Sequence, residues 1–381
     1  MKKIYVCGAS QTKFGYLRED IGTLMLIAAK KAISQSKIDL AEIEAIIVAN
    51  FSSSFTQQCH LPSLLASRLN TNKEIVRVES ACAAGSVAIK EAAIYLESGL
   101  YQTVMVVGVE KMSEVSMDMT TLTLAMAASP EERRHGATFP SQYALIARTY
   151  LEKYGVNEVD LAKVAVKNHH NALLNPLAHF HKKIDVETVL KSRMIASPLK
   201  LLDCSPISDG AAAVILSTKK SISHPKNRPV RLIGWGHAVD AIELYKRRDL
   251  ASIPVVALAS KKAYKMADLL PRDINIAELH DCFTIAELIE MEELGFCKKG
   301  EAKEMIRTGK TELTGELPIN TSGGLKAKGH PIGATGVSQV VEIVKQLQNK
   351  AAQRQVKNVH KGLCCNIGGS GGSCVVTIFS N

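Results

Sequence analysis

Residues Glu79-Ser80-Ala81-Cys82-Ala83-Ala84-Gly85-Ser86 place one cysteine between an apolar strand and a helix of small residues. The pattern predicts the strand at 76–78 and the helix at 83–98, where alanine and valine recur on one stripe and Gly99 follows as a stop signal. We therefore expect Cys82 in the first helical turn, where unpaired N–H groups and the helix dipole favour a thiolate. Its pKa should fall below the usual value of about 8.5, which would make the sulfur a nucleophile.

The two ends of the chain repeat one plan. In each half, a helix is followed by a buried strand, at 21–35 and 43–48 and again at 257–269 and 274–279. Alternating strands and helices predict mostly parallel sheets with helices packed on their faces. The repetition predicts two pseudo-symmetric halves.

The segment between the two halves has a different character. It contains a polar run at 131–136 and a stretch rich in histidine and asparagine at 168–181, and a buried strand resumes only at 209–216. We interpret residues 119–207 as an inserted loop domain, called the lid below. The expected division is therefore residues 1–118 with 208–222 as the N-terminal half, 119–207 as the lid, and 223–381 as the C-terminal half.

Composition excludes several classes of protein. The 381 residues are 46% hydrophobic and carry a formal charge of +10, but lysine and arginine are dispersed, aromatics make up only 5%, and no nucleic-acid-binding module is present. No signal peptide is visible, and the apolar stretch at 23–29 is too short to cross a bilayer. Nine cysteines without paired spacing favour free thiols in a reducing compartment. We expect a soluble cytoplasmic protein without nucleic-acid or membrane partners.

Four unusual segments fall at expected strand ends, where ligands gather in open α/β sheets. They are Cys82, His280-Asp281-Cys282-Phe283, the run Gly329-His330-Pro331-Ile332-Gly333-Ala334-Thr335-Gly336, and the glycine-rich residues 366–372. If the halves face each other, these segments meet in one cleft. Two thiols, two imidazoles and exposed N–H groups are suited to acyl transfer coupled to proton abstraction.

These motifs resemble those of the thiolase family, and within it the sterol-carrier-protein-type and archaeal-type branch. The resemblance covers essentially the whole chain and includes Asp-Gly-Ala-Ala-Ala at 209–213 and Gly-Val-Glu-Lys-Met-Ser at 108–113. It implies an α/β thiolase fold with two βαβαβαββ halves in a five-layered α-β-α-β-α arrangement. It also implies a homodimer or homotetramer.

The resemblance also implies roles for individual residues. Cys82 would be acylated by a thioester, and His330 would take its proton and later help to bind a thioester oxygen. Asn366 stands where mainstream thiolases carry their second reactive cysteine, so Cys282 is assigned as the acid/base. His280 would stabilise an oxyanion, and the N–H groups of Cys82 and Gly368 would form a second oxyanion hole.

The implied reaction is ping-pong acyl transfer between CoA thioesters. An acyl-CoA acylates the nucleophile, and the carbanion of a second acyl-CoA attacks the acyl-enzyme to give a 3-ketoacyl-CoA; the reverse reaction cleaves that product. Acetoacetyl-CoA or short-to-medium 3-ketoacyl-CoA is the expected substrate. CoA takes part as substrate and product, and neither a permanently bound cofactor nor a metal is expected.

Some alternatives stay open at the sequence level. Cys365 precedes the glycine-rich run and could replace Cys282 as the acid/base if the backbone register differs. The histidines of the lid could suggest a metal, but their spacing matches no zinc pattern. Two other functions also remain open: a condensing enzyme of the same superfamily, and a weakly catalytic CoA-binding subunit that scaffolds a partner.

Overall fold

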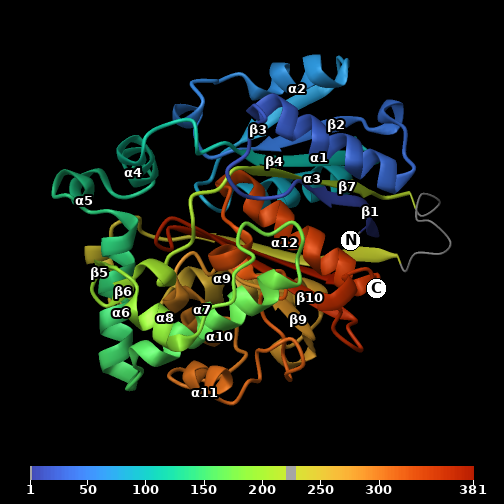
Figure 1. The fold of residues 1–381 in the computed structure, drawn as a ribbon. Coiled ribbons are helices and arrows are strands. Elements are labelled where there is room, and N and C mark those ends of the chain that lie inside the picture. The colour runs from blue at the N-terminus through green and yellow to red at the C-terminus, as the bar shows by residue number, and fades with distance from the viewer. Residues whose placement is uncertain (1, 220–228) are drawn as a thin grey trace.

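The computed structural model describes residues 2–219 and 229–381 (Figure 1). The N-terminal half follows the predicted βαβαβαββ order. Its elements are β1 (Ile4–Gln11), α1 (Ile21–Ser36), β2 (Ala45–Ala49), α2 (Leu61–Leu69), β3 (Glu74–Val78), α3 (Ala84–Ser98), β4 (Thr103–Glu110) and β7 (Gly210–Ser217).

The C-terminal half repeats this order, except that its third strand is reduced to an isolated bridge. A single parallel bridge between Ala277 and Ile319 lies where the first half has its third strand. The elements are β8 (Val230–Val239), α9 (Pro254–Ala267), β9 (Ile276–Glu278), α10 (Thr284–Glu293), α11 (Ala302–Arg307), α12 (Ile332–Leu347), β10 (Lys361–Gly368) and β11 (Ser373–Ser380).

The strand order shows the pseudo-symmetry directly. One nine-stranded sheet runs β3-β2-β4-β7-β1-β8-β11-β10-β9. If β8, β9, β10 and β11 are taken as the counterparts of β1, β2, β4 and β7, the order is the same read outward from the centre in both directions. The centre is the antiparallel pair of β1 and β8, so an approximate two-fold axis passes between these strands.

The expectation of mostly parallel sheets is wrong. Among the strands of the described residues, parallel pairing is limited to β2 with β3, β2 with β4, and β9 with β10, and the other strand pairs are antiparallel. In the N-terminal half, β4 and β7 pair antiparallel although several helices lie between them in the sequence. Residues 369–372 join β10 to β11 by a short turn, which permits only antiparallel pairing.

Alternating side chains on the strands build five layers. On β4, Val104 and Val106 face a central core that includes residues of both α3 and α12, whereas Met105 and Val107 face an outer core with α1 and α2. The C-terminal strands β10 and β11 face a second outer core that contains α9 and α10. The predicted α-β-α-β-α arrangement is confirmed, and Figure 1 shows α12 running between the two halves.

Glycines allow the two central helices to cross closely. A Cβ on Gly85 of α3 would lie 2.9 Å from the backbone nitrogen of Gly336 on α12. A Cβ on Gly336 would lie 2.4 Å from the backbone nitrogen of Ser86. Since no side chain fits at either point, the crossing needs glycine on both helices. It brings together the N-terminal ends of α3 and α12, and with them Cys82 and His330.

The segment between β4 and β7 is mainly helical. It contains α4 (Met117–Ala125), α5 (Pro130–Arg134), α6 (Phe139–Tyr154), α7 (Glu158–Leu173), α8 (Val186–Lys191) and the small hairpin of β5 (Met194–Ala196) with β6 (Leu199–Lys200). Figure 1 shows α4 and α5 standing out from the body of the molecule. The expected boundary at 222/223 lies outside the described residues.

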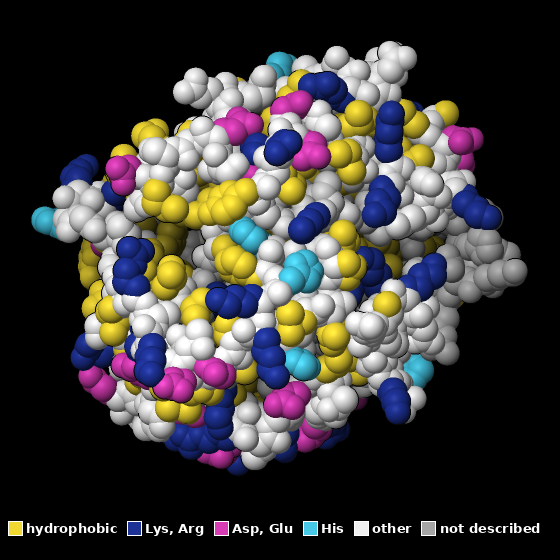
Figure 2. Space-filling model, in the orientation of Figure 1, with side chains coloured by type: hydrophobic (Ala, Val, Ile, Leu, Met, Phe, Trp, Pro, Cys, Tyr) yellow, Lys and Arg dark blue, Asp and Glu magenta, His cyan; other side chains and the backbone are white. Residues whose placement is uncertain are grey.

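Two features of the structure concern membrane and nucleic-acid partners. Within residues 2–219 and 229–381, none of the helices has both the length and the hydropathy that a bilayer span requires. Figure 2 shows lysine and arginine scattered over one face of the molecule with acidic side chains between them.

Candidate active site

The turn that carries Cys82 differs from the prediction by one helical position. Helix α3 begins at Ala84 with Ala83 as its N-cap, so Cys82 precedes the first helical turn. Ala81 adopts φ = 47°, a left-handed conformation that costs a residue with a Cβ about 1–2 kcal/mol. The N–H groups of Ala83 and Ala84 close the turn on the carbonyls of Ser80 and Ala81. The strained turn therefore sets the sulfur at the mouth of the helix.

The predicted low pKa of Cys82 is wrong for the ligand-free protein. The residue keeps part of its surface exposed, but burial of the thiol raises its pKa to about 12. Backbone N–H groups of Gly369 and of Cys82 itself lower the pKa, while the charge of Glu110 raises it. Because loss of hydration outweighs these donors, Cys82 rests as a thiol and needs a base to remove its proton.

The structure brings Cys82, His280 and His330 together. One side-chain atom from each lies within 4.8 Å of the others. Within the described part of the chain, this is the one group of histidine, cysteine or carboxylate side chains with spacing that would suit a metal ion. The lid histidines do not form such a group; His179, for example, bonds Ser208.

His330 lies at the N-terminal end of α12 with one ring nitrogen engaged. Its Nδ1 is 2.7 Å from Oγ1 of Thr335, and that hydroxyl donates to the carbonyl of Pro331 at 2.9 Å. Since the hydroxyl proton is used, Thr335 accepts from Nδ1–H, and Nε2 of His330 keeps a free lone pair. Burial, with the charge of Lys328, lowers the pKa of His330 to about 3. The ring is therefore neutral and available to accept a proton.

His280 follows β9 and is fully buried. Its ring meets that of His330 edge to face with centroids 5.1 Å apart. Its Nδ1 lies 2.8 Å from Nδ2 of Asn366, and its backbone N–H donates to Glu290 at 2.9 Å. Burial, and then the neighbouring His330, lower its pKa well below the usual range. Both imidazoles in the site are thus uncharged.

Cys282 lies on the same turn as His280. Its N–H donates to the carbonyl of His280 at 2.8 Å, and its own carbonyl accepts from Ser205 of the lid at 2.9 Å. Burial raises the pKa of the thiol well above its ordinary value, as do the charges of Cys82, Glu290 and Asp281. The hydroxyl of Tyr143 on α6 donates to the carbonyl of Gly369 at 3.2 Å and lowers the pKa of the Cys282 thiol.

Cys365 has different surroundings. Its sulfur lies 3.7 Å from the sulfur of Cys374. Burial, together with Cys374 and Glu290, raises the pKa of this thiol well above its ordinary value. Asn366, the next residue on β10, is the one that reaches His280. Since successive strand side chains point to opposite faces, the side chain of Cys365 points away from the face where Asn366 meets His280. The geometry favours Cys282 over Cys365 as the second thiol of the site.

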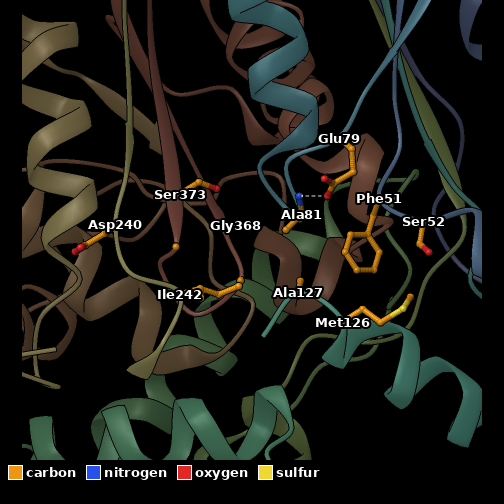
Figure 3. A pocket seen from close by; sticks show the side chains of 12 residues that line it. Phe51, Ser52, Glu79, Ala81, Met126, Ala127, Asp240, Ile242, Gly368 and Ser373 are labelled. Atoms are coloured by element: carbon orange, nitrogen blue, oxygen red, sulfur yellow. Dashed lines mark hydrogen bonds between the residues drawn. The ribbon is translucent and has the colours of Figure 1, made fainter. Parts of the chain in front are cut away.

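A cavity of about 430 Å³ opens beside the nucleophile turn. In Figure 3, Phe51 and Met126 lie on one side of it and Asp240 and Ile242 on the other. The remaining walls are formed by Ser52, Glu79, Ala81, Ala127, Gly368, Gly369, Gly372 and Ser373. Gly368 and Gly369 both line this cavity, and the backbone N–H of Gly369 lowers the pKa of the Cys82 thiol.

Four residues in and around the site were not expected from the sequence. Thr335 and Asn366 hold the two imidazoles, and the hydroxyl of Tyr143 lowers the pKa of Cys282. Glu110 at the end of β4 is buried and accepts from the N–H groups of Phe51 at 2.8 Å and Gly333 at 3.0 Å, which ties the two halves together; burial raises its pKa to about 7. Thr335 and Glu110 lie inside motifs that the sequence singled out, and this was a usable signal. Tyr143 has no local signal, because only the fold brings α6 to the site.

Comparison with known proteins assigns the family. Residues 4–220 match the thiolase N-terminal domain and residues 236–381 match the thiolase C-terminal domain-like family. The chain is 42% identical to an acetyl-CoA acetyltransferase of Methanothermobacter thermautotrophicus over the full length of both chains. It is 32% identical to sterol carrier protein 2 of Gallus gallus, with all of this chain and 72% of that protein covered.

A solved structure gives the same result for the fold. The Ltp2–ChsH2(DUF35) aldolase superposes with a TM-score of 0.86 at 24% identity, over 99% of this chain and 97% of that one. The two family matches together leave only a few residues at the N-terminus and the link between the halves uncovered. The chain belongs to the thiolase family.

Proposed function

We propose that this thiolase is an acyl-CoA C-acyltransferase that makes or cleaves 3-ketoacyl-CoA through an acyl-Cys82 intermediate. The observation that carries the proposal is the meeting of Cys82, His280 and His330 within 4.8 Å. Cys282 lies close enough for the charge of Cys82 to raise the pKa of the Cys282 thiol. Full-length similarity to an acetyl-CoA acetyltransferase supports thiolase acyl transfer with CoA thioesters as substrates.

The first half-reaction acylates the nucleophile. Nε2 of His330 takes the proton of Cys82, and the thiolate attacks the thioester carbonyl carbon. We propose that the N–H groups of Cys82 and Gly368 donate to the developing oxyanion, beside the N–H of Gly369 that lowers the pKa of the Cys82 thiol. The bond between the carbonyl carbon and the CoA sulfur then breaks, and CoA leaves with the proton of Cys282.

The second half-reaction forms the carbon–carbon bond. Cys282, now a thiolate, removes a proton from the α-carbon of a second acyl-CoA, and the resulting carbanion attacks the acyl carbon on Cys82. The bond to Cys82 breaks, and His330 returns its proton to the sulfur. Each thiol that loses a proton in the first half-reaction regains one in the second. The same groups therefore catalyse the reverse reaction, which cleaves a 3-ketoacyl-CoA.

Protonation in the ligand-free site supports this order. Burial holds both thiols protonated and both imidazoles neutral. A thiol that rests protonated can give its proton to the departing CoA sulfur, which leaves a thiolate where the next step needs a base. The high pKa of that thiolate makes it a strong base toward a carbon acid.

The remaining parts of the proposal concern the surroundings of the site. Residues 119–207 are proposed as a lid that limits access of water to the acyl-enzyme, because Met126 and Ala127 line the cavity and Tyr143 reaches Cys282. Residues 1–118 with 208–222, and 223–381, are proposed as the two halves. We propose that acetoacetyl-CoA or short-to-medium 3-ketoacyl-CoA is the substrate, that no cofactor is permanently bound, and that the protein is a cytoplasmic homodimer or homotetramer.

Mass spectrometry of the protein after mixing with acetyl-CoA tests the proposal. One acetyl group should appear on the peptide that contains Cys82 and should be absent in Cys82→Ala. Cys59→Ala is the matched control, because Cys59 is an exposed thiol outside the site and its loss should leave the adduct in place. An unmodified Cys82 in the wild-type protein would contradict the proposal and favour a CoA-binding scaffold.

A further inference from the structure

We propose that Asn366 is a positioning residue that holds His280 as the tautomer with its proton on Nε2, so that this ring presents a hydrogen-bond donor to a substrate thioester oxygen. The inference rests on the proposed function and adds a residue whose role the thiolase motifs leave unassigned. It starts from the hydrogen bonds around the Asn366 amide on β10.

The amide of Asn366 is oriented by two neighbours. Its Oδ1 accepts from the backbone N–H of Ser86 on α3 at 3.4 Å, and its Nδ2 lies 2.8 Å from Nδ1 of His280. An amide nitrogen can only donate, so Nδ1 of His280 accepts and carries no proton. In a neutral imidazole the single proton must then be on Nε2.

Burial keeps this arrangement uncharged and closed to water. Both Asn366 and His280 are fully buried, and burial lowers the pKa of His280 well below its usual range, so the doubly protonated ring does not form. Within the part of the chain that the structure describes, Nε2 of His280 has no hydrogen-bond partner. A buried donor without a partner is costly, so its retention at this position indicates that a ligand atom completes it.

The two imidazoles of the site are therefore opposite tautomers. Thr335 accepts from Nδ1 of His330 and leaves Nε2 as an acceptor, whereas Asn366 donates to Nδ1 of His280 and leaves Nε2 as a donor. The rings lie edge to face at 5.1 Å. One ring is thereby prepared to take the proton of Cys82 and the other to stabilise negative charge on an oxygen.

The substitution Asn366→Asp tests the role because it keeps the shape and reverses the hydrogen bond. A carboxylate only accepts, so the proton of His280 should move to Nδ1, and Nε2 would face the substrate oxygen as a lone pair. Loss of one oxyanion donor lowers kcat by about 10²–10³-fold in other enzymes, and we expect a decrease of this order in condensation. Acetylation of Cys82, for which the backbone N–H groups of Cys82 and Gly368 are the proposed donors, should change much less.

The spectroscopic readout does not depend on activity. Nitrogen-15 NMR of histidine-labelled protein, with His280 assigned by its loss in His280→Gln, should show the proton on Nε2 in the wild type and on Nδ1 in Asn366→Asp. Asn381→Asp is the matched control, because Asn381 is also paired with a histidine, His360, but through an exposed hydrogen bond outside the site. It should alter neither His280 nor condensation.

Three outcomes separate the inference from the function it rests on. A wild-type spectrum with the proton of His280 on Nδ1 would overturn the inference even if the enzyme is active. Equal losses of acetylation and condensation in both Asn366→Asp and the uncharged Asn366→Ala would overturn it as well, since a structural role alone predicts that pattern. Absence of Cys82 acetylation in the wild type would instead overturn the proposed function and leave the tautomer measurement standing.

Discussion

The two halves of the molecule share one strand plan but prepare their strand ends by different means. In the N-terminal half, a backbone turn strained at Ala81 presents the sulfur of Cys82, and the nearest donors to it are backbone N–H groups. In the C-terminal half, the groups are two imidazoles, each held by a partner side chain, and a second thiol whose pKa is lowered by the hydroxyl of Tyr143.

The C-terminal half also contains more buried charge beneath the site. Asp281 accepts from the N–H of Leu325 at 2.7 Å and from Asn168 at 2.6 Å, and Glu290 accepts from the N–H of His280 at 2.9 Å. Among the described residues, three ion pairs with both side chains buried lie in this half or between it and the lid: Lys167 with Glu287, Lys328 with Glu278, and Arg354 with Glu342. The described part of the N-terminal half has one such pair, Lys111 with Asp209.

The difference follows from the property that each half has to control in its functional groups. A single sulfur needs only a position, which a backbone turn supplies. An imidazole must also have its proton on a defined nitrogen, and this requires a partner of known donor or acceptor character that is itself held by a satisfied polar shell. The comparison therefore predicts that the reactivity of Cys82 depends most strongly on pH. It also predicts that removal of a single hydroxyl group impairs the function of His330 or Cys282.

The largest expected effect is the pH dependence of Cys82 alkylation. Because the pKa of this thiol is raised to about 12, its thiolate fraction should increase about tenfold for each pH unit below that value. The rate of modification by iodoacetamide, followed by mass spectrometry of the Cys82 peptide, should rise without a plateau from pH 7 to pH 10. A plateau near neutral pH would show instead that the helix end depresses the pKa, as the sequence suggested.

Removal of the hydroxyl that holds His330 should have the next largest effect. Thr335→Val keeps the side-chain shape but frees Nδ1, so the ring can adopt the tautomer that has no lone pair on Nε2. Since a general base contributes about 10²–10⁴-fold, partial loss of the correct tautomer should slow acetylation of Cys82 by roughly ten- to a hundredfold in a rapid-quench measurement. Thr335→Ser retains the hydroxyl and should restore most of the rate; equal defects in both variants would contradict the role.

The smallest effect is expected where the lid meets the C-terminal half. Tyr143→Phe removes the hydroxyl that lowers the pKa of Cys282 but keeps the ring stacked on Phe283, whose centroid is 4.5 Å away. The pKa of Cys282 should rise further, and exchange of the α-protons of acetyl-CoA with deuterium, measured by NMR, should slow by roughly three- to tenfold. The rising limb of its pH profile should move upward.

Tyr150→Phe is the matched control for this variant. Tyr150 lies two turns further along α6, is equally buried, and donates to Glu292 outside the site. Its loss should leave the exchange rate and its pH profile unchanged. If both variants slow exchange equally, the hydroxyl of Tyr143 acts only through the stability of α6.

The sequence was sufficient for the plan of the fold and for the groups that meet at its centre. Periodicity and the strand-end motifs place Cys82, His280 and His330 at strand ends that the two-fold arrangement brings together.

The sequence was not sufficient for properties that depend on the surroundings of a residue in the folded protein. The pKa of Cys82 is set by burial from both halves and could not be read from one turn, and Tyr143 is brought to Cys282 by a lid helix about 140 residues away in the chain. The last two strands of each half pair antiparallel although their connections differ, a short turn at 369–372 in one half and the lid in the other, and the local patterns do not reveal this.

The most direct test of the central claim is Cys282→Ala mixed with acetyl-CoA in deuterated water. If the N-terminal half supplies the nucleophile and the C-terminal half the base, the variant should still place one acetyl group on Cys82 while exchange of the α-protons and formation of acetoacetyl-CoA are lost. Undiminished exchange and condensation would contradict the account and favour a condensing enzyme that uses other groups for this step.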